Sequence, residues 1–524
     1  MCGLAGCFGI KDEVTVNQML DTLGHRGPDD RGIYSFGQSV LGHTRLSIVD
    51  VAHGHQPILT RDGKQGIVCN GEIYNFQDLK GKLSSKHTFK TNSDTEVILH
   101  LYQEKGPECV TALDGMFAFA IFNGDDFMLA RDPVGIKPLY IGYRNDSMYF
   151  SSELGAMSHA GVDHVLEFPA GHYYTPEEGF VQYYTIPEKS DYILTDIDET
   201  CELIRKTFTN AVKKRLLADP EIPVGAFCSG GLDSSLIAAI AAEEIPHLHT
   251  FAVGMEDKTG EVSDDIKAGR IAAGHIGSTH HELIFTEDDY YAALPVVIQK
   301  METYDPATVR CAVPCYFTCK LASDYVTVVL TGEGADELFA GYHYIKNFSI
   351  NDVDEETRRL IAGLHNINLQ RADRMGMYFG LELRVPFLDV EMIDLSMKIP
   401  AELKVLDHGG TKIEKWILRK AFEKMNYLPE DILWRYKVQY TQGAGCEGLG
   451  EKLAETEISN EEFERIKSEN PQAVINSKEA ALYFKIFRRY HPQNSILGSI
   501  GIWEGFDFKE ERVSVRGTVG ENLM

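Results

Sequence analysis

The stretch Cys228-Ser229-Gly230-Gly231-Leu232-Asp233-Ser234-Ser235 decides the fold of the second part of the chain. The apolar run Val224–Phe227 before it predicts a buried strand, and the alanine-rich segment Ser234–Glu244 predicts a helix. At such a strand-to-helix turn, backbone N–H groups and the helix dipole favour bound phosphate, and glycine lets the backbone approach closely. The stretch therefore predicts a strand-loop-helix unit with a phosphate-binding loop.

The same alternation of strands and helices continues after this loop. Helical stretches such as Asp264–His275 separate short apolar runs, which is typical of a parallel sheet covered by helices. From about residue 352 the chain is predicted to be mainly helical, and the residues after Glu511 to form a loose tail. The apolar runs are His249–Val253, His281–Phe285 and Tyr325–Leu330.

The first part of the chain has a different pattern of predicted secondary structure. Its short β-like runs are separated by Gly, Asn and Asp, which predicts a sheet-rich domain. The pattern ends near Thr185–Thr200 in a polar, acidic connection, and 524 residues exceed what one hydrophobic core usually holds. We therefore expect one domain over residues 1–190 and a second over 200–524. The β-like runs are Ile67–Cys69, Met116–Phe122, Phe127–Ala130 and Tyr149–Ser151.

The acidic composition narrows the classes of partner. A formal charge of −27 and a pI near 5.1 disfavour nucleic acid and anionic membrane, because both are bound by clustered Lys and Arg. No stretch approaches the apolar length of a membrane span, and the first residues lack a basic segment followed by an apolar one. We expect small-molecule substrates and a cytoplasmic location.

Ten cysteines are spread unevenly along the chain, which is unlike the dense disulfide framework of a small secreted domain. Cys311, Cys315 and Cys319 recur every four residues and would share one stripe of a helix. A metal or cluster site is one interpretation of them. No matching Cys/His pair lies nearby, so packing of reduced thiols is the favoured interpretation.

Cys2 directly follows the initiator methionine. Removal of Met1 would leave a first residue that carries both a thiol and an α-amine. An α-amine with a pKa of about 7.7 to 8 can accept the thiol proton near neutral pH, so nucleophile and base come from one residue. Cys2 is therefore a candidate catalytic nucleophile.

Four polar, glycine-rich segments accompany Cys2, and together they resemble those of class II glutamine amidotransferases. Glutamine carries a carboxylate, an ammonium group and an amide, so its site needs a cation, an anion and an oxyanion hole. The alternative is that Asn70-Gly71 is only a tight turn and Arg45–Asp50 an edge strand. The segments are His25-Arg26-Gly27-Pro28-Asp29, Arg45-Leu46-Ser47-Ile48-Val49-Asp50, Asn70-Gly71-Glu72-Ile73-Tyr74-Asn75 and Ser93-Asp94-Thr95-Glu96.

The resemblance implies roles for five residues that bind glutamine. Arg45 would pair with its carboxylate and Asp94 with its ammonium group. Asn70 and Gly71 would stabilise the tetrahedral oxyanion and so belong to the catalytic set. Glu72 would help to fix the substrate and the loop.

The phosphate-binding loop lacks the Gly-Lys-Ser/Thr of a Walker P-loop and resembles the pyrophosphate loop of N-type ATP pyrophosphatases. Such enzymes attach AMP to a carboxylate or carbonyl. The resemblance implies ATP as a substrate and Mg²⁺ held by Asp233 and Asp336. A plain glycine turn is the alternative. The expected ATP-binding residues are Ser229, Gly230, Gly231, Leu232, Asp233, Ser234, Ser235, Val253, Thr331, Gly332 and Lys437.

Further motifs follow in the order found in asparagine synthetases. The resemblance places Glu333 and Glu337 near the acceptor, with Glu333 also a possible proton acceptor from ammonia. Lys437 would neutralise charge on the α-phosphate. A solvated helix start and a surface lysine are the alternatives. Thr308 and Arg310 would also be acceptor ligands. The motifs are Glu302-Thr303-Tyr304-Asp305, Thr308-Val309-Arg310, Thr331-Gly332-Glu333-Gly334-Ala335-Asp336-Glu337, Arg384-Val385-Pro386-Phe387-Leu388-Asp389 and Trp434-Arg435-Tyr436-Lys437.

The resemblance runs from Cys2 to about Gly445. It implies an amino-terminal-nucleophile (Ntn) αββα sandwich, an α+β fold, joined to a doubly wound parallel-sheet ATP pyrophosphatase domain. Ammonia would pass between the sites through an internal channel that Met116 lines, and a homodimer is possible. The implied reaction is glutamine- and ATP-dependent amidation of aspartate to asparagine through β-aspartyl-AMP.

Three residues depart from the family pattern on the acceptor side. Ala307 stands where a threonine is usual, Ala335 where a serine is frequent, and Val438 where an acid often follows the lysine. Lost hydrogen-bonding groups change which acceptor a site accepts. A different carboxylate acceptor is therefore the alternative function, and a non-enzymatic storage or binding role is a third hypothesis.

Overall fold

The structure is a computed structural model that describes residues 2–124, 126–188 and 194–503. Residues 189–193, within the expected interdomain connection, and the tail expected after Glu511 lie outside the described residues. The domain limits at 190 and 200 therefore stay predictions. Among the described helices, none has the length and apolar character needed to cross a membrane.

Two antiparallel six-stranded sheets form the first part of the chain. Their strand orders are β10-β8-β9-β1-β3-β2 and β12-β11-β7-β6-β5-β4. The first sheet contains β1 (Gly3–Phe8), β2 (Asp30–Phe36), β3 (Ser39–Arg45), β8 (Tyr140–Arg144), β9 (Ser147–Ser151) and β10 (Asp163–Glu167). The second contains β4 (Ile58–Leu59), β5 (Gln65–Ile73), β6 (Gly115–Asn123), β7 (Asp126–Arg131), β11 (His172–Thr175) and β12 (Gly179–Gln182).

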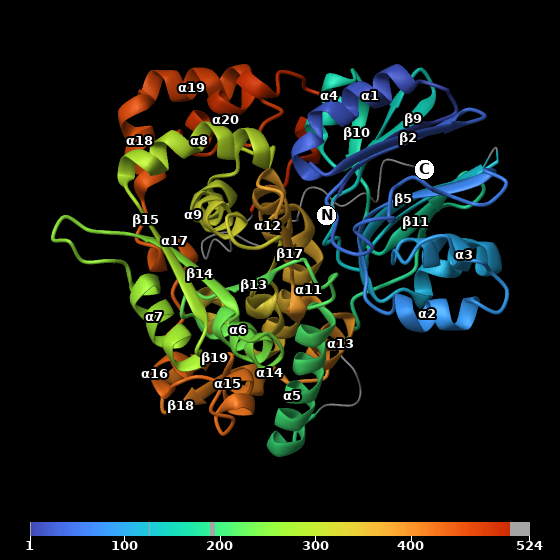
Figure 1. Ribbon diagram of the computed structural model, residues 1–524. Coiled ribbons are helices and arrows are strands. Elements are labelled where there is room, and N and C mark those ends of the chain that lie inside the picture. Colours follow the sequence, from blue (N-terminus) through green and yellow to red (C-terminus); the bar gives the residue numbers. More distant parts are fainter. Residues whose placement is uncertain (1, 125, 189–193, 504–524) are drawn as a thin grey trace.

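The two sheets pack face to face between helices. Successive side chains of a strand point to opposite faces, so Ala118 and Ala120 of β6 fill the space between the sheets. Phe119 and Ile121 of the same strand join the core under the outer helices. Helices α1 and α4 cover the first sheet, and α2 and α3 cover the second (Figure 1). The predicted αββα sandwich is confirmed. The helices are α1 (Glu13–Thr22), α2 (Phe76–Leu83), α3 (Glu96–Lys105) and α4 (Leu154–His159).

A five-stranded parallel sheet organises the second part. Its strand order is β15-β14-β13-β16-β17. From β13 the chain adds β14 and β15 on one side, and it then adds β16 and β17 on the other side of β13. Such a reversal leaves a crevice at the carboxyl ends of the two central strands, where open α/β sheets bind ligands. The strands are β13 (Val224–Phe227), β14 (His249–Met255), β15 (Thr279–Phe285), β16 (Val328–Leu330) and β17 (Glu382–Arg384).

Helices cover both faces of this sheet. α6 and α7 pack on β13 and β14 from one face, while α9 and α12 contact the other face (Figure 1). Val328 and Leu330 of β16 belong to one core and Val329 to the other, as expected of a strand buried on both sides. The predicted doubly wound sheet is confirmed. The helices are α5 (Ile197–Lys214), α6 (Leu232–Glu244), α7 (Asp264–Ile276), α8 (Glu287–Met301), α9 (Pro306–Ser323) and α12 (Asn368–Tyr378).

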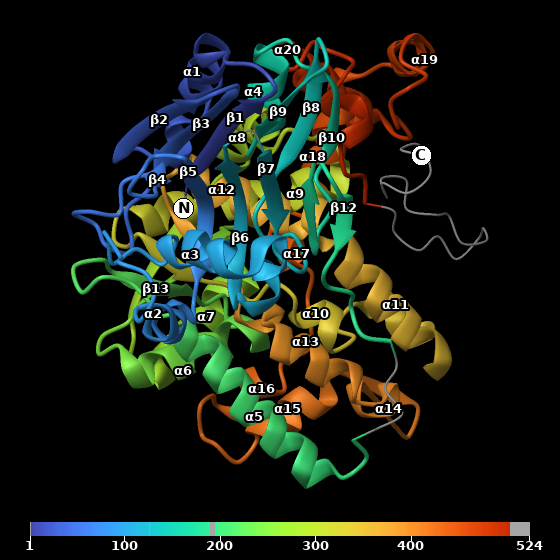
Figure 2. The same ribbon diagram turned by 90° about the vertical axis from the view of Figure 1, so that its right-hand side faces the viewer.

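The remaining elements lie mainly in the helical region (Figure 2). β17, with only three residues, falls where the sequence predicted helix, because so short a strand has no readable period. β18 (Val405–His408) and β19 (Thr411–Glu414) form a separate hairpin. The helices are α10 (Ala335–Leu338), α11 (Ile350–Gly363), α13 (Val390–Met397), α14 (Ala401–Lys404), α15 (Trp416–Phe422), α16 (Glu430–Leu433), α17 (Tyr440–Gly443), α18 (Leu449–Glu457), α19 (Asn460–Glu469) and α20 (Lys478–Tyr490).

Candidate functional site

Cys2 lies where the two sheets of the sandwich meet, immediately before β1. Its backbone nitrogen donates a 2.9 Å hydrogen bond to Oδ1 of Asn70 on β5, and its carbonyl accepts a 3.0 Å bond from Nε of Arg26. Burial raises the pKa of the Cys2 thiol, while the charge of Arg45 opposes that rise. Nδ2 of Asn70 is buried without a protein partner, so it can donate to a ligand beside the thiol.

Asn70 and Gly71 lie inside a strand, where they pair with Ala118 and Phe117 of β6. The alternative of a tight turn is therefore wrong. Gly71 has a φ of +151°, and a Cβ there would lie 2.0 Å from the carbonyl oxygen of Met116. Only glycine lets β5 approach β6 this closely, which also leaves the backbone beside Asn70 uncovered by a side chain.

Arg45 and Asp94, the predicted cation and anion, are both buried. The Arg45 guanidinium donates to the carbonyls of Val49, Asp50 and Val51, which fixes the following loop and uses three of its five N–H groups. Asp94 accepts a 2.7 Å bond from the backbone N–H of Ile73. Burial raises the pKa of Asp94 to about 6, so a bound ammonium group would favour its ionised form.

Glu72, the last predicted glutamine ligand, is also buried. Its Oε1 lies 3.7 Å from a guanidinium nitrogen of Arg384, and its Oε2 has no protein partner. Burial and the nearby charge of Asp94 raise the pKa of Glu72 well above its usual value. It thus lies against Arg384 of β17, at the junction with the parallel sheet.

A cavity of about 580 Å³ lies at the carboxyl ends of β13 and β16, where the strand order reverses. No side chain caps the amino terminus of α6 at Gly231, so its first N–H groups remain available to an anion. Thirteen of the predicted residues line the cavity: Ser229, Gly231, Leu232, Asp233, Ser234, Val253, Thr308, Arg310, Thr331, Gly332, Glu333, Asp336 and Lys437.

Three predicted residues lie outside the cavity wall. A Cβ at Gly230 would lie 2.2 Å from the backbone of Ala268, so this glycine allows close packing against α7. Ser235 is fully buried and its hydroxyl lies 3.9 Å from the sulfur of Cys228. Glu337 is buried behind Tyr342, whose hydroxyl donates to it at 2.5 Å. Burial and the nearby Asp336 charge raise the pKa of Glu337 to about 7.

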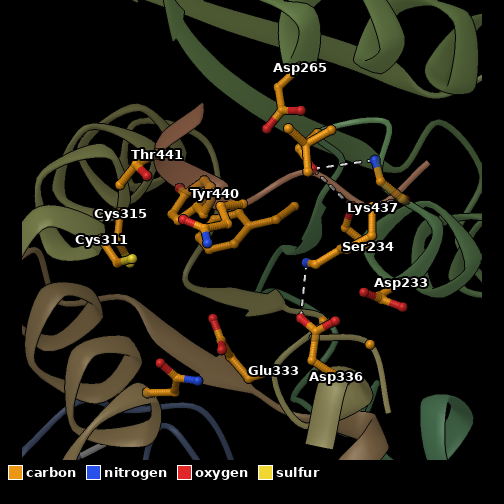
Figure 3. A pocket seen from close by; sticks show the side chains of 18 of the residues that line it. Asp233, Ser234, Asp265, Cys311, Cys315, Glu333, Asp336, Lys437, Tyr440 and Thr441 are labelled. Atoms are coloured by element: carbon orange, nitrogen blue, oxygen red, sulfur yellow. Dashed lines mark hydrogen bonds and ion pairs between the residues drawn. The ribbon is translucent and has the colours of Figure 1, made fainter. Parts of the chain in front are cut away.

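Two lysines meet two carboxylates on the cavity wall, and Figure 3 shows Lys437, Asp233 and Asp336 of this group. Nζ of Lys415 lies 2.5 Å from Asp233 and 2.7 Å from Asp336, and Nζ of Lys437 lies 2.9 Å from Asp336. Burial opposes ionisation, yet the charges of both lysines lower the pKa of Asp336 and the Asp336 charge raises that of Lys437. The sequence predictions missed Lys415.

The carboxylate pair fits a divalent cation. An ammonium group already bridges Asp233 and Asp336, and Oδ1 of Asp233 is buried without a hydrogen-bond partner. Magnesium in nucleotide sites is usually held by one or two carboxylates and by phosphate oxygens. Asp233 and Asp336 can therefore hold Mg²⁺ together with a nucleotide.

The predicted acceptor residues Thr308, Arg310 and Glu333 all have partners within the protein. Arg310 is held by Glu479 and Glu451 at the cavity rim. The Thr308 hydroxyl donates to Asp305 at 2.6 Å, which caps α9. The cation that contacts Glu333 is Arg371 of α12, at 2.5 Å, and the sequence predictions missed it.

The cysteine stripe lies on α9. Cys311 and Cys315 line the cavity, and Figure 3 shows them on the side opposite Asp233. Cys319 is fully buried, with its sulfur 4.0 Å from that of Cys315. Among the described residues, no group of three or more His, Cys, Asp or Glu side chains is arranged to hold a metal ion. The stripe packs α9 and forms part of the cavity wall.

Helix α12 joins the two sites. Asp373 receives two bonds from the Arg26 guanidinium, at 2.7 and 3.1 Å, and Arg26 also holds Cys2. Arg374, one residue further, lies 3.0 Å from Glu153 and 2.9 Å from Glu302. Because Arg371 is on the same helix, one rigid element contacts both the Cys2 and the Glu333 surroundings.

A sequence signal was available for the α12 residues but not for Lys415. Residues 371–374 read Arg-Ala-Asp-Arg on a helix that also carries Leu369 and Met375, and charges on a buried helix are rare unless they are paired. Lys415 sits between a hairpin strand and a helix with no motif around it, and only the tertiary fold carries it to Asp233.

Comparisons with known proteins find relatives for both parts of the chain. Residues 1–182 match the glutamine amidotransferase domain family, and residues 203–352 and 349–485 match the asparagine synthase family. A probable glutamine-hydrolysing asparagine synthetase of Dictyostelium discoideum is 38% identical over 96% of this chain and 96% of its own. Asparagine synthetase B of Escherichia coli is 38% identical over 94% of this chain and 92% of its own.

Among solved structures, glutamine phosphoribosylpyrophosphate amidotransferase from B. subtilis covers 49% of this chain and 67% of its own, with 22% identity and a TM-score of 0.32. The sequence matches span both parts of the fold. This chain belongs to the family of glutamine-hydrolysing asparagine synthetases.

Proposed function

We propose that this enzyme converts aspartate to asparagine, with glutamine as the nitrogen donor and ATP as the activator, and releases glutamate, AMP and pyrophosphate. One observation carries the proposal: a buried cysteine beside an unpartnered amide donor lies in the same chain as a cavity with carboxylates, lysines and a free helix amino terminus. Family membership supports it.

In the first site, the Cys2 thiol attacks the side-chain amide carbon of glutamine. The α-amine freed by removal of Met1 accepts the thiol proton and returns it to the leaving ammonia. Nδ2 of Asn70 and the N–H of Gly71 stabilise the developing oxyanion. Arg45 and Asp94 hold the glutamine carboxylate and ammonium groups. Water then hydrolyses the glutamyl thioester on Cys2.

In the second site, the β-carboxylate of aspartate attacks the α-phosphorus of ATP and pyrophosphate leaves. The amino terminus of α6 and the Ser234 hydroxyl bind the phosphates, and Lys437 stabilises charge on the α-phosphate. Mg²⁺ held by Asp233 and Asp336 would neutralise phosphate oxygens. Ammonia then attacks the acyl-adenylate carbon, its proton passes to the phosphate of the leaving AMP, and AMP departs.

Ammonia must reach the second site unprotonated, which a closed path inside the protein allows. Met116 is fully buried opposite Glu72 on the paired strands β5 and β6. We propose that Met116 lines that path, because its strand partner Glu72 lies 3.7 Å from Arg384 of β17.

Product analysis with matched variants tests the proposal. With aspartate, glutamine and MgATP, the protein should form asparagine, AMP and pyrophosphate in equal amounts. Cys2→Ala should abolish glutamine-dependent synthesis and retain synthesis from ammonium salts, whereas Lys437→Met should abolish both and retain glutamine hydrolysis. Formation of ADP, or pyrophosphate release with another carboxylic acid but not aspartate, would contradict it.

Ala307 and Val438 line the cavity, so the same assay with a panel of carboxylic acids tests the alternative of a different acceptor. We further propose a cytoplasmic location, to be checked by cell fractionation. A homodimer is also proposed, and light scattering should then give twice the chain mass of 58.7 kDa.

A further inference from the structure

Arg371 is a cavity-lining cation with an unused donor. Its side chain is 8% exposed, and one guanidinium nitrogen lies 2.5 Å from Oε1 of Glu333. A second nitrogen donates to Oδ1 of Asn368 at 3.1 Å. The third, Nε, is buried without a hydrogen-bond partner. A buried N–H without a partner is costly, which indicates that a ligand completes it.

The surroundings of Arg371 hold its guanidinium plane in place. Nδ2 of Asn368 donates to Glu337 at 3.1 Å, and Tyr342 donates to the same oxygen. Asn368 is therefore fixed on one side while it accepts from Arg371 on the other. A guanidinium fixed in this way is prepared to bind a planar carboxylate.

The other arginines that line the cavity among the described residues have their charge matched elsewhere. Arg310 is held by Glu479 and Glu451. Arg419 bonds to Glu414 and to two backbone carbonyls, and Arg435 pairs with Asp265 at 3.0 Å. In contrast, the partner of Arg371 is Glu333, which itself faces the cavity.

We propose that Arg371 binds the α-carboxylate of the acceptor amino acid, while Glu333 binds its α-ammonium group. This assignment rests on the proposed function and adds a specificity-determining residue to it. A paired cation and anion can receive a zwitterion without leaving net charge buried in the cavity. Asp336 follows Glu333 by three residues and lies 2.9 Å from Lys437, so an acceptor anchored at its α-groups would direct its side-chain carboxylate towards Lys437.

The test uses acceptors that lack one group each. 3-Aminopropanoate is aspartate without the α-carboxylate, and succinate is aspartate without the α-ammonium group. Pyrophosphate release is measured with each acceptor for the wild-type protein, Arg371→Gln and Arg371→Lys. Arg465→Gln on the exposed face of α19 is the matched control, because its side chain is 59% exposed.

A charge-assisted hydrogen bond is worth about 1.5 to 3 kcal/mol, or about 10- to 100-fold. Arg371→Gln should therefore lower kcat/KM for aspartate and succinate by about 10- to 100-fold and leave that for 3-aminopropanoate within about threefold. Arg371→Lys keeps the charge that balances Glu333, so it guards against misfolding, and should lose about tenfold for aspartate. The KM for ATP and glutamine hydrolysis should not change.

Each outcome has a distinct meaning. An equal loss for aspartate and 3-aminopropanoate in both variants would overturn the assignment of Arg371. Equal use of these two acceptors by the wild-type protein would overturn it as well. A wild-type protein that releases no pyrophosphate with aspartate but does so with another amino acid would instead refute the proposed function.

Discussion

Replacing Asp373 by asparagine should weaken both the fold and glutamine hydrolysis. Asp373 is buried on α12 and receives two bonds from Arg26, whose Nε fixes the carbonyl of Cys2. Asparagine keeps the shape and one acceptor oxygen, but it removes the charge and points an N–H₂ group at a guanidinium. Arg26 would then rely on Glu153, which Arg374 also uses.

The magnitude follows from burial. Removal of one partner from a buried ion pair costs about 3 to 5 kcal/mol, because it leaves an uncompensated charge in the interior. Since Glu153 stays 2.9 Å from Arg26, we expect the lower end, about 3 kcal/mol. A terminal nucleophile held less firmly also loses reactive geometry, so kcat for glutamine hydrolysis should fall by about 10- to 100-fold.

Urea unfolding and two activity assays measure these effects. Synthesis from ammonium salts bypasses Cys2 and should stay within about twofold of wild type at a temperature where the variant is folded. Glu469→Gln is the control, since it removes a carboxylate from an exposed pair at 3.1 Å and should cost less than about 1 kcal/mol. A loss below 1 kcal/mol for Asp373→Asn, or equal loss of both activities, would refute the reasoning.

Three further predictions concern single residues. Burial raises the pKa of Asp94 to about 6, so the ionised fraction of Asp94, and with it the affinity for glutamine, should rise as pH increases through that value. Asp94→Asn should therefore flatten the dependence of the KM for glutamine on pH. An unchanged profile would exclude Asp94 as the ammonium ligand. The same raised pKa affects folding stability in the opposite direction to glutamine affinity. The stability that Asp94 contributes is fully present below pH 3.8, its pKa in the unfolded chain, and is lost as pH rises through about 6. Gly71→Ala would place a Cβ 2.0 Å from the Met116 carbonyl oxygen and should destabilise the protein by about 1 to 3 kcal/mol in urea unfolding, whereas Gly81→Ala, which meets no atom within 4 Å, should not. Lys415→Met removes the ammonium group that bridges Asp233 and Asp336. Added MgCl₂ should therefore raise the Tm of this variant by more than it raises the Tm of the wild-type protein. Equal increases in the two proteins would argue against a shared cation site.

The strand-loop-helix unit at Ser229–Ser235 was predictable because local physics alone sets it. An apolar run, glycines and an alanine-rich helix follow one another between Val224 and Glu244, and the structure places β13 and α6 there within two residues of the prediction. In the same way, Cys2 and the Asn70-Gly71 pair were identifiable from residue chemistry. Their contact across 68 residues was implied only by the resemblance.

Residues whose role depends on pairing with distant segments were harder to predict from the sequence. Arg310 and Arg371 are both arginines on helices, and no local pattern shows which of them keeps a donor available to a ligand. Packing against α18 and α20 gives Arg310 two carboxylate partners, whereas the position of α12 under Glu333 leaves Arg371 with a free N–H. The side chain that remains available to a ligand is therefore a property of the neighbours.

By itself, the sequence determined which chemical groups this protein possesses and the fold class of each part, because strand and helix periods, glycine positions and residue chemistry are local. The tertiary structure decided which of those groups face a ligand and which face each other. In the folded protein Lys415 bonds to Asp233 of the carboxylate pair, and Glu337 is buried behind Tyr342. Helix α12 contacts the surroundings of both sites. The reason is that burial and charge pairing depend on segments hundreds of residues apart, which meet only when the chain has folded.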